Sequence, residues 1–245
     1  MGNGQILYKE LVEKIKQNEE EYWFAEFVYF KALEQLEDVS RDVGKLKLKE
    51  HVLDVIRIFL LQWGQMARAI EREKSPTDWD KLTKNIRSQK NAFQRLVGKD
   101  LLNINFDEVA GDIECIYNKL AEVRNIGATA TSKILHLLNP DVFVMWDGEI
   151  IRTYRKKYEK VRANAKGYVE FLKAVQREVK EAIEEEAKRS GKSEKQIVEE
   201  ICTNLPSKKL GPEYSRKSLA KLVDEYNWML AHRNNKNFQN EKHEV

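Results

Sequence analysis

Hydrophobic residues recur every three or four positions along most of the chain, which is the spacing of helices with one buried face. Strand-like alternation of apolar and polar residues is almost absent. The pattern therefore predicts an all-α protein of about ten helices, a two-lobed bundle without a sheet. The clearest predicted helices cover residues 7–19, 21–36, 52–62, 109–123, 168–187 and 219–229.

Turn-forming and capping residues predict where some of these helices begin and end. Ser193, followed three residues later by Gln196, forms a capping box that starts a helix. Pro76 is placed at the first helical position of a further helix, which the apolar pattern extends to Val97. Gly98 then follows as the residue that ends it.

The segment 120–152 carries the most informative motif, LAEVRNIGATATSKILHLLNPDVFVMWDGEIIR. A predicted helix meets a tight turn at 125–127, centred on Gly127, and a second helix then runs to Leu138. An Asn-Pro pair ends that helix, and a short apolar stretch brings Asp147 to the start of a third helix. The order is therefore helix, tight turn, helix, short connection and a carboxylate at the start of a third helix.

A tight turn that leads into a helix leaves backbone N–H groups free to bind an anion, and the helix dipole strengthens the site. Such a site can hold a DNA phosphate without reading the base sequence. Arg124 at the turn and Arg152 beyond Asp147 are also well placed for phosphate. The predicted set of DNA-backbone contacts is Arg124, Asn125, Ile126, Gly127, Ala128, Thr129 and Arg152.

Asp147 has two interpretations that do not exclude each other. Aspartate is a preferred helix N-cap, so its carboxylate is expected to cap a helix over 148–158. The same carboxylate, if it faces a cleft, could stabilise an oxocarbenium-like sugar or orient a water molecule. That chemistry requires the target nucleotide to leave the base stack first.

The segment from Asn125 to Asp147 resembles the helix-hairpin-helix DNA glycosylases, the superfamily of endonuclease III and of the adenine-mismatch and 8-oxoguanine glycosylases. The family hairpin usually reads Leu-Pro-Gly-Val-Gly and is followed by a helix, a proline-containing connection and an aspartate. Here Asn125 stands for the first hairpin glycine, Gly127 matches the second, and Asp147 followed by Gly148 is similar to the adenine-mismatch branch. Asparagine tolerates positive φ, so it is an acceptable replacement for glycine.

The resemblance implies a catalytic role for Asp147 in base excision repair, with one departure from the family pattern. Thr129 stands eighteen residues before Asp147, where bifunctional members carry their Schiff-base lysine. The resemblance therefore implies a monofunctional enzyme that hydrolyses the N-glycosidic bond in a single step. Lys133 lies one helical turn after Thr129 and either reaches the same site or contacts phosphate or solvent. Thr129 either lines the pocket or caps its helix.

Candidate residues for the base pocket lie on both sides of this motif. Gln62, Trp63 and Gln65 follow an apolar helix at about the place where family members carry a wedge that replaces the flipped base. Trp63 could stack on a base or belong to the core. Trp146 and Tyr154 flank Asp147 and could form pocket walls or pack between two domains.

The resemblance also implies two helical domains. Residues 45–145, which include the hairpin at 120–138, form the central domain, and residues 1–44 with 146–232 form the second. The polar, Asn- and Lys-rich residues 233–245 are expected to be a disordered tail.

Composition and charge place some further limits on partners, cofactors and location. The net charge is only +3, so a DNA-binding surface must come from local clustering. Cys115 and Cys202 are expected to be reduced thiols on apolar helix faces, and the four histidines lack metal-ligand spacing. We expect no metal or other cofactor and, because no long apolar run or signal peptide occurs, a cytoplasmic protein without a membrane partner. The oligomeric state is left open.

Three functions therefore fit the sequence. The first is a DNA glycosylase acting on a damaged or mismatched base, and the second is a non-catalytic helix-hairpin-helix protein that binds nucleic acid or a protein. In the third, the hairpin is coincidental in an all-α scaffold. The enzyme requires an open, polar cleft beside Asp147. The non-catalytic alternatives allow Asp147 to be buried in a cap or in an ion pair with Arg152.

Overall fold

The computed structural model describes residues 8–36, 50–64, 66–70, 75–206, 208–211, 214 and 216–240. Within these ranges every regular element is a helix and no strand occurs, so the predicted all-α class is confirmed. The helices are α1 (Tyr8–Gln35), α3 (Glu50–Gln62), α4 (Ala67–Ile70), α5 (Trp79–Ser88), α6 (Lys90–Gln94), α7 (Phe106–Ala121), α8 (Ala128–Leu138), α9 (Gly148–Lys157), α10 (Ala165–Ser190), α11 (Glu194–Asn204), η2 (Lys208–Leu210) and α12 (Leu219–Asn240).

The helix α1 is continuous, whereas the sequence predicted two helices that separate near residue 20. The polar residues at the expected break are not a surface turn. Asn18 and Glu19 are both buried, and Glu19 accepts a hydrogen bond from Lys217, which lies just before α12. A partner from the far end of the chain therefore lets this polar stretch stay helical inside the protein.

The single helix predicted over 76–97 is instead the two short helices α5 and α6. The first begins after Asp78, whose side chain accepts a hydrogen bond from the Lys81 amide at 2.9 Å, so Pro76 lies outside it. Gly98 has the positive φ of 71° expected at a turn. The capping box of Ser193 and Gln196 is present at the start of α11, as predicted.

The last helix is longer than the sequence suggested. α12 continues to Asn240, past the residue at which the tail was expected to begin. Once a helix is nucleated, each further residue adds a backbone hydrogen bond, so a polar sequence can extend it. The rest of the predicted tail, residues 241–245, lies outside the described residues.

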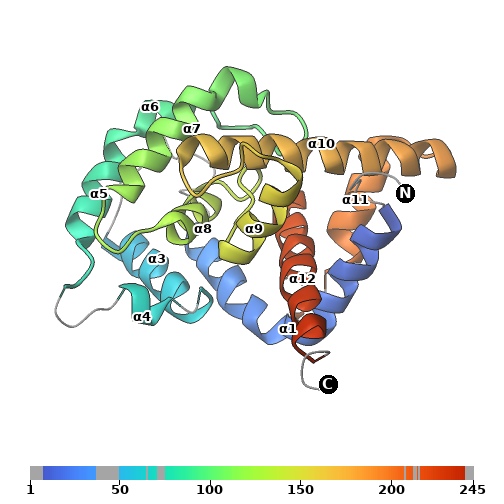
Figure 1. The fold of residues 1–245 in the computed structure, drawn as a ribbon, viewed down its shortest axis with the longest axis horizontal. Coiled ribbons are helices and arrows are strands. Elements are labelled where there is room, and N and C mark those ends of the chain that lie inside the picture. Colours follow the sequence, from blue (N-terminus) through green and yellow to red (C-terminus); the bar gives the residue numbers. More distant parts are fainter. Residues whose placement is uncertain are drawn as a thin grey trace.

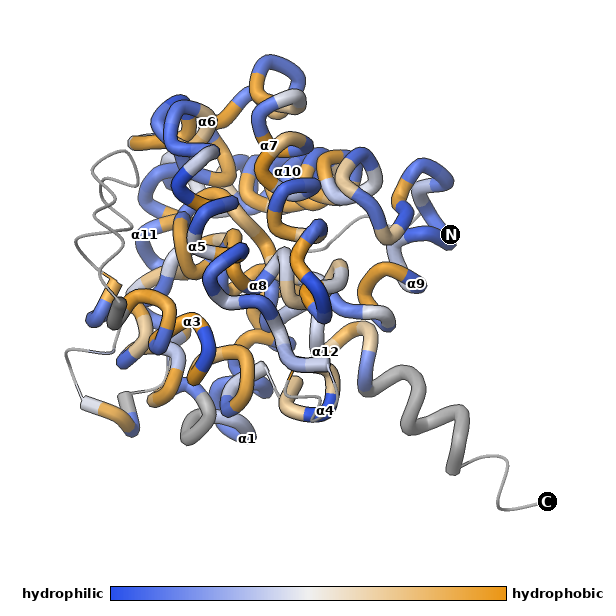
Figure 2. Tube along the Cα trace, turned by 90° about the vertical axis from the view of Figure 1, so that its left-hand side faces the viewer, coloured by the Kyte–Doolittle hydropathy of each residue, from blue (hydrophilic) through white to orange (hydrophobic). Residues whose placement is uncertain are grey.

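The helices surround one hydrophobic core, and α8 lies at its centre (Figure 1). α8 buries eight of its eleven residues. Around it α7 packs along α10, and α1 packs along α12. Figure 2 shows apolar and polar residues alternating in short stretches along the helices, as expected where one face is buried. The core is continuous across both predicted domains, and the division into two remains a prediction.

Two further observations concern the surroundings of the core. Cys202 is buried, but Cys115 is exposed, so the expectation of an apolar setting is wrong for Cys115. The exposed face of α7 carries it. None of the described helices has an apolar stretch long enough to cross a bilayer.

Candidate functional site

The turn before α8 is formed by Asn125, which has a φ of 67° and is the one non-glycine residue with positive φ in the described ranges. Its side-chain amide donates a hydrogen bond to the Ser75 carbonyl oxygen at 2.7 Å. The next residue, Ile126, is buried, and its amide donates to the Val123 carbonyl at 3.0 Å. Asn125 thus takes the left-handed conformation, and its side-chain hydrogen bond to Ser75 holds the turn.

Gly127 has a different role from the one expected of it. Its φ of −86° and ψ of −173° are open to any residue, so the bend is centred on Asn125 and not on Gly127. A Cβ atom built on Gly127 would meet no atom within 4 Å. The glycine therefore leaves open space at the start of α8, and folding does not require it.

The start of α8 has no side-chain cap: Gly127 is its N-cap residue, and the Thr129 side chain does not cap the helix. The caps of α5, α7, α9, α10 and α11 each accept a backbone N–H through a side-chain oxygen. The first N–H groups of a helix have no intrahelical acceptor. At α8 these donors are therefore available at the surface of the turn.

The two predicted phosphate-binding arginines lie in different settings. Arg124 is exposed at the turn, where it donates to the Ser75 hydroxyl at 3.2 Å. Arg152 is 64% exposed and pairs with Glu149 at 2.5 Å on its own helix. Arg152 is therefore not the partner of Asp147.

Asp147 uses its two carboxylate oxygens for two different contacts. Oδ1 accepts hydrogen bonds from the amides of Glu149 and Ile150, both at 2.9 Å, and so caps α9 as predicted. Oδ2 lies 2.8 Å from Nε2 of His232 on α12. The His232 ring stacks on Trp228, with centroids 4.8 Å apart. The side chain of Asp147 remains 25% exposed, so its cap role does not bury it.

A cleft of about 420 Å³ lies beside Asp147. A volume of this order is typical of small-molecule sites. Five of the residues singled out in the sequence line it, namely Trp63, Thr129, Lys133, Trp146 and Asp147. The sequence motif and the apolar helix before Trp63 therefore meet at one cavity.

Two other pocket or wedge candidates, Tyr154 and Gln62, do not line this cleft. Tyr154 is buried in the core, with its hydroxyl within hydrogen-bond distance of Glu178 (3.2 Å) and Asn227 (2.9 Å). Tyr154 is therefore not a wall of this cleft, and its hydroxyl finds its partners on α10 and α12, within the second predicted domain. Gln62 is exposed at the end of α3, and Gln65 lies outside the described residues.

Trp63 is both part of the core and a wall of the cleft. Its ring stacks on Phe59 with centroids 4.8 Å apart, and its Nε1 donates to Glu26 at 3.5 Å. Trp146 is 1% exposed, and its indole N–H donates to the Ala128 carbonyl at 3.1 Å. Both rings are held rigidly by these contacts.

Lys133 projects into the cleft from α8. Its Nζ donates to the Gly64 carbonyl at 3.2 Å and lies 5.1 Å from the centre of the Trp63 ring. Burial lowers the pKa of Lys133, although Asp224 and Asp147 oppose this effect. Of the two alternatives, the structure places this lysine in the site and not at the solvent-facing surface.

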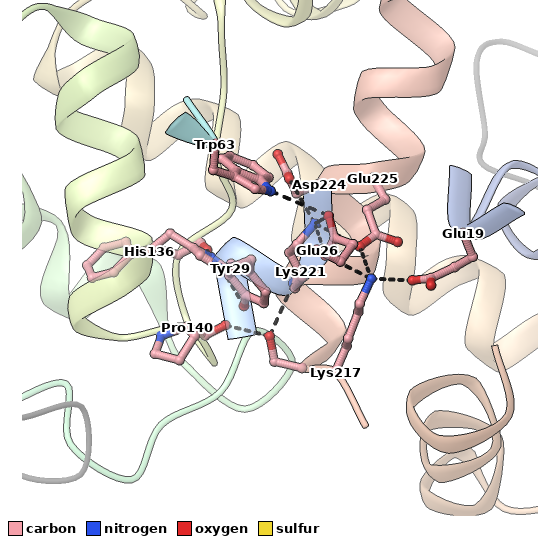
Figure 3. Close-up of polar contacts among 12 residues, drawn as sticks. Glu19, Glu26, Tyr29, Trp63, His136, Pro140, Lys217, Lys221, Asp224 and Glu225 are labelled. Atoms are coloured by element: carbon pink, nitrogen blue, oxygen red, sulfur yellow. Dashed lines mark hydrogen bonds and ion pairs between the residues drawn. The ribbon is translucent and has the colours of Figure 1, made fainter. Parts of the chain in front are cut away.

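Two buried lysines, Lys217 just before α12 and Lys221 on α12, contact carboxylates of α1 and α12 (Figure 3). Lys221 also lines the cleft. Nζ of Lys217 contacts Glu19, Glu225 at 2.6 Å and Glu26 at 2.9 Å. Nζ of Lys221 contacts Glu225 at 2.7 Å and Glu26 at 3.3 Å. These contacts join the first and last helices through charged groups that are shielded from water.

The protonation of this cluster follows from burial and from the shared lysines. Burial opposes the charge of Lys217 and Lys221, but Glu225 and Glu26 raise the pKa of both. Burial likewise opposes the charge of Glu26, but the two lysines lower its pKa below the usual range. Burial raises the pKa of Glu225 to about 8, and its Oε2 has no hydrogen-bond partner. Glu225 is therefore the carboxyl that holds a proton.

The histidine of α8 belongs to the core. Nδ1 of His136 lies 2.6 Å from the Phe143 carbonyl and therefore donates to it, so Nε2 accepts from the Tyr29 hydroxyl at 2.9 Å. Burial lowers the pKa of His136 to about 4. This neutral, fully paired ring is a packing residue. In the described ranges no group of three or more His, Cys, Asp or Glu side chains is arranged to hold a metal ion.

The sequence reading missed the wall of the cleft that α12 provides. The apolar residues of this segment, such as Leu222 and Met229, predicted a helix, and none of its other residues was proposed for the site. Other residues of α12 line the cleft and follow helical spacing: Lys221, Asp224, Glu225, Trp228 and His232. Polar and aromatic residues that repeat at this spacing within an otherwise apolar helix were the signal available in the sequence.

A larger cavity of about 810 Å³ lies elsewhere, among residues 98–103, the start of α11 and the segment before α12. None of the predicted site residues lines it. We place the candidate site at the smaller cleft, because Thr129 and Lys133 of α8 and the carboxylate of Asp147 all line it.

Comparisons with protein-family models, curated proteins and solved structures found no match for this chain. The resemblance to the helix-hairpin-helix glycosylases therefore depends on the segment from Asn125 to Asp147 and on its geometry.

Proposed function

We propose that the protein binds DNA and, as a base-excision DNA glycosylase, hydrolyses the N-glycosidic bond of a nucleotide rotated into the cleft. The observation that carries this proposal is the position of Asp147. One carboxylate oxygen is fixed as a helix cap, and the other faces a partner at the edge of a 420 Å³ cleft. A fixed carboxylate beside a cavity of this size is suited to stabilise positive charge on a bound molecule.

The turn at 125–129 is proposed to hold the DNA backbone. Uncapped N–H groups at the start of a helix bind phosphate, and the open space beside Gly127 lets a strand approach them closely. Thr129, in the first turn of the same helix, lines the cleft. A strand bound at the turn would therefore present a neighbouring nucleotide to the mouth of the cleft.

The cleft offers surfaces that suit an extruded base. Trp63 and Trp228 line it, and aromatic rings stack on bases with little sequence preference. Rotating a nucleotide out of the duplex costs a few kcal/mol, which such stacking offsets. In its ionised form, Asp147 would stabilise the oxocarbenium-like sugar and orient the attacking water.

Single-step hydrolysis fits the residues present better than a lyase reaction. Thr129 lacks the amine that a Schiff base needs. Lys133 lines the cleft, but its Nζ is bound to the Gly64 carbonyl and lies over the Trp63 ring. We therefore propose a monofunctional enzyme.

A non-catalytic nucleic-acid-binding protein is the second candidate, and one observation favours it. The cleft is lined by four carboxyl groups, those of Glu26, Asp147, Asp224 and Glu225, and by only two lysines. Such a lining has no excess of positive charge to attract a phosphodiester backbone. A protein that only binds DNA would use the turn and leave the cleft empty.

An excision assay separates these two candidates. Purified protein is incubated with duplexes carrying uracil, hypoxanthine, 8-oxoguanine, alkylated bases or mismatches, and strand breaks are measured with and without alkali. The glycosylase predicts breaks that appear only after alkali for at least one substrate, and their loss in Asp147→Asn. Binding to abasic-site DNA without any base release would instead support the non-catalytic protein.

A further inference from the structure

We propose that a second surface, outside the cleft, binds one arm of the DNA duplex, and that this surface is the basic segment formed by residues 155–166. The segment covers the end of α9, the connection after it and the first turn of α10. Its ligand is the phosphate backbone, which it contacts without reading the base sequence. This inference rests on the proposed binding of DNA and extends it to residues that do not line the cleft.

The first support is the concentration of charge. Six of the twelve residues 155–166 are Lys or Arg and one is acidic, so the basic segment carries a net charge of six minus one, or +5. The whole chain carries +3, so the other 233 residues together carry −2. The cleft, with its four carboxyl groups and two lysines, has no excess of cations. Attraction for a phosphate backbone therefore has to come from outside the cleft, and the cations gather in this segment.

The second support is that most of these cations are not neutralised within the protein. Lys157 is 3.7 Å from the carboxylate of Glu178, and Arg162 donates to the neighbouring Val161 carbonyl at 3.1 Å. Four others are exposed, and their side chains make no ion pair or hydrogen bond in the part of the chain that the structure describes: Arg155, Lys156, Lys160 and Lys166. These four are available to an external anion.

The third support is that helix stability explains only part of the cluster. The basic residues in the last turn of α9 lie where positive charge is favourable to the helix dipole. Lys166 lies in the first turn of α10, where positive charge is unfavourable, and that turn contains no acidic residue. Lys160 and Arg162 come shortly before the same helix start. The cations around the start of α10 therefore weaken the helix slightly, which indicates another use for them.

A second basic stretch, residues 81–99 on α5 and α6, is less suited to this role because part of its charge is used inside the protein. Nζ of Lys81 donates to the Glu122 carbonyl at 3.0 Å, and the guanidinium of Arg95 pairs with Asp112. The helix α7, which carries Asp112, packs against both α5 and α6. The basic segment at 155–166 is the less neutralised of the two.

The surface of the basic segment favours DNA over an anionic membrane. A basic helix that binds lipid also exposes apolar residues that enter the bilayer. In the described ranges the exposed large apolar residues are Phe27 and Ile58, and both lie on other helices. The apolar residues Ile150 and Tyr154 of α9 are buried. Cations without exposed apolar neighbours match a phosphate backbone better than a bilayer.

The position of the basic segment determines which part of the duplex it contacts. α9 begins after Asp147 and has ten residues, so its end lies about 15 Å from that residue. This length corresponds to about four to five base pairs at about 3.4 Å each. The segment is therefore assigned to base pairs from about the fifth outward, on one side of a nucleotide held at Asp147.

The first test measures how the DNA affinity depends on salt. A fourfold variant, Arg155→Gln with Lys156→Gln, Lys160→Gln and Lys166→Gln, is compared with the wild type on an abasic-site duplex with about ten base pairs on each side. Fluorescence anisotropy gives the affinity at several salt concentrations. Each lost phosphate contact makes the slope of log affinity against log salt shallower by about 0.9, so we expect a change of about 2 to 4 and at least about a tenfold loss of affinity. An unchanged slope overturns the proposal.

A matched control neutralises four exposed lysines of other helices and changes the net charge equally: Lys9→Gln, Lys16→Gln, Lys188→Gln and Lys195→Gln. It should keep the wild-type slope, and an equal change in both variants overturns the proposal. Thermal unfolding checks that both variants are folded. If the fourfold variant is not, Lys160→Gln alone, in the connection between two helices, should still make the slope shallower by about 0.9.

The second test shortens the duplex on one side of the abasic site at a time. Cutting one arm, and only one, below about five base pairs should lower the wild-type affinity and its salt slope. On that shortened duplex the wild type and the fourfold variant should bind equally. If the wild type binds the long duplex and both shortened ones with the same slope, the basic segment does not contact DNA.

Vesicles of phosphatidylcholine with and without phosphatidylserine test the alternative partner. If the fourfold variant loses binding to the anionic vesicles but keeps the wild-type DNA affinity and slope, the basic segment binds membranes and the proposal is overturned.

This proposal and the glycosylase function can fail separately. If the wild type releases no base but its DNA affinity depends on the basic segment, the glycosylase function is wrong and the assignment of the segment stands. If base release occurs and the fourfold variant binds DNA like the wild type, the glycosylase function stands and the assignment of the segment is wrong.

Discussion

Oδ2 of Asp147 lies 2.8 Å from Nε2 of His232, although 85 residues separate them in the sequence. Oδ1 of the same carboxylate caps α9. One side chain thereby connects the start of α9 to the last helix. Its position at the edge of the cleft is fixed by both contacts.

These two contacts predict different effects for two substitutions of Asp147. Asparagine can still accept the amide hydrogen bonds of the cap, so Asp147→Asn should change the free energy of unfolding little. Asp147→Ala removes the cap and should cost about 1 kcal/mol. Base release should be lost in both, while affinity for abasic-site DNA is retained in Asp147→Asn. Urea unfolding, excision and DNA-binding assays test this, and a joint loss of binding and release would contradict the separation of roles.

Asn125 should tolerate glycine better than alanine. Its φ is 67°, which alanine adopts at a cost of about 1–2 kcal/mol and glycine adopts freely. Both substitutions also remove the hydrogen bond to Ser75, worth about 1 kcal/mol. Asn125→Gly should therefore destabilise the protein by about 1 kcal/mol and Asn125→Ala by about 2 to 3 kcal/mol. If urea unfolding gives the same loss of unfolding free energy for both variants, the left-handed conformation at residue 125 contributes little to stability.

Gly127→Ala should weaken DNA binding without harming the fold. Its backbone is in an ordinary extended region and a Cβ meets open space, so the free energy of unfolding should be unchanged or slightly raised. The added methyl group would occupy the space proposed for the DNA backbone. Affinity should then fall by a similar factor on two unrelated duplex sequences, as measured by fluorescence anisotropy.

Gly111→Ala on α7 is the matched control, because a Cβ there also meets open space. It should leave the DNA affinity unchanged. A loss that depends on base sequence, or an equal loss in both glycine variants, would argue against a backbone contact at the turn.

Borohydride should not trap a covalent complex between the wild-type protein and abasic-site DNA. Thr129, which the proposed resemblance places at the lysine position, has no amine, and Lys133 is held by Gly64 and Trp63. The measurement is a band of reduced mobility on a denaturing gel. A trapped complex that disappears in Lys133→Ala would show that this lysine, whose pKa is lowered by burial, acts as the nucleophile instead.

The stability of the protein should fall as pH rises from about 5 to about 8. The pKa of Glu225 is about 8 in the folded protein, above its ordinary value, so the folded state keeps a proton that the unfolded state has released. Each such proton lowers the free energy of unfolding by up to about 1.4 kcal/mol per pH unit. Asp224 adds an effect of the same sign up to about pH 7.

Glu225→Gln should flatten this pH dependence, most clearly between pH 7 and 8, because it removes the group that titrates there. The amide oxygen can still accept hydrogen bonds from Lys217 and Lys221. Urea unfolding at several pH values measures the slope. If wild type and Glu225→Gln lose stability equally over this range, another group holds the proton.

The sequence predicted local features well where neighbouring residues determine them. Two helix caps were predicted correctly, those at Asp147 and Ser193, because each cap side chain lies within three residues of the backbone groups that it binds. The positive φ of Asn125 follows from the intrinsic preference of asparagine for that conformation. The end of the helix at Gln62 followed from the Trp-Gly pair after it. Such short-range signals are readable without a fold.

The sequence could not predict contacts between distant segments. The polar residues near Glu19 predicted a break between two helices, because their partner Lys217 is 198 residues away in the sequence. Tyr154 was a candidate for the pocket wall because it lies near Asp147 in the sequence. In the structure its hydroxyl donates a hydrogen bond to Asn227 in the core. No site residue was predicted on α12, because its contact with Asp147 joins residues that are 85 positions apart. Whether a polar residue is paired inside the protein depends on tertiary packing.

The packing of α1 against α12 has a consequence for synthesis of the protein. Tyr22 and Glu26 supply one wall of the cleft, and Asp224 and His232 supply another, so the cavity cannot close before α12 has left the ribosome. Until then, the buried glutamates of α1 have no lysines to neutralise them. A nascent chain would therefore carry an unpaired acidic helix, and assembly of the cavity would be among the last events of folding.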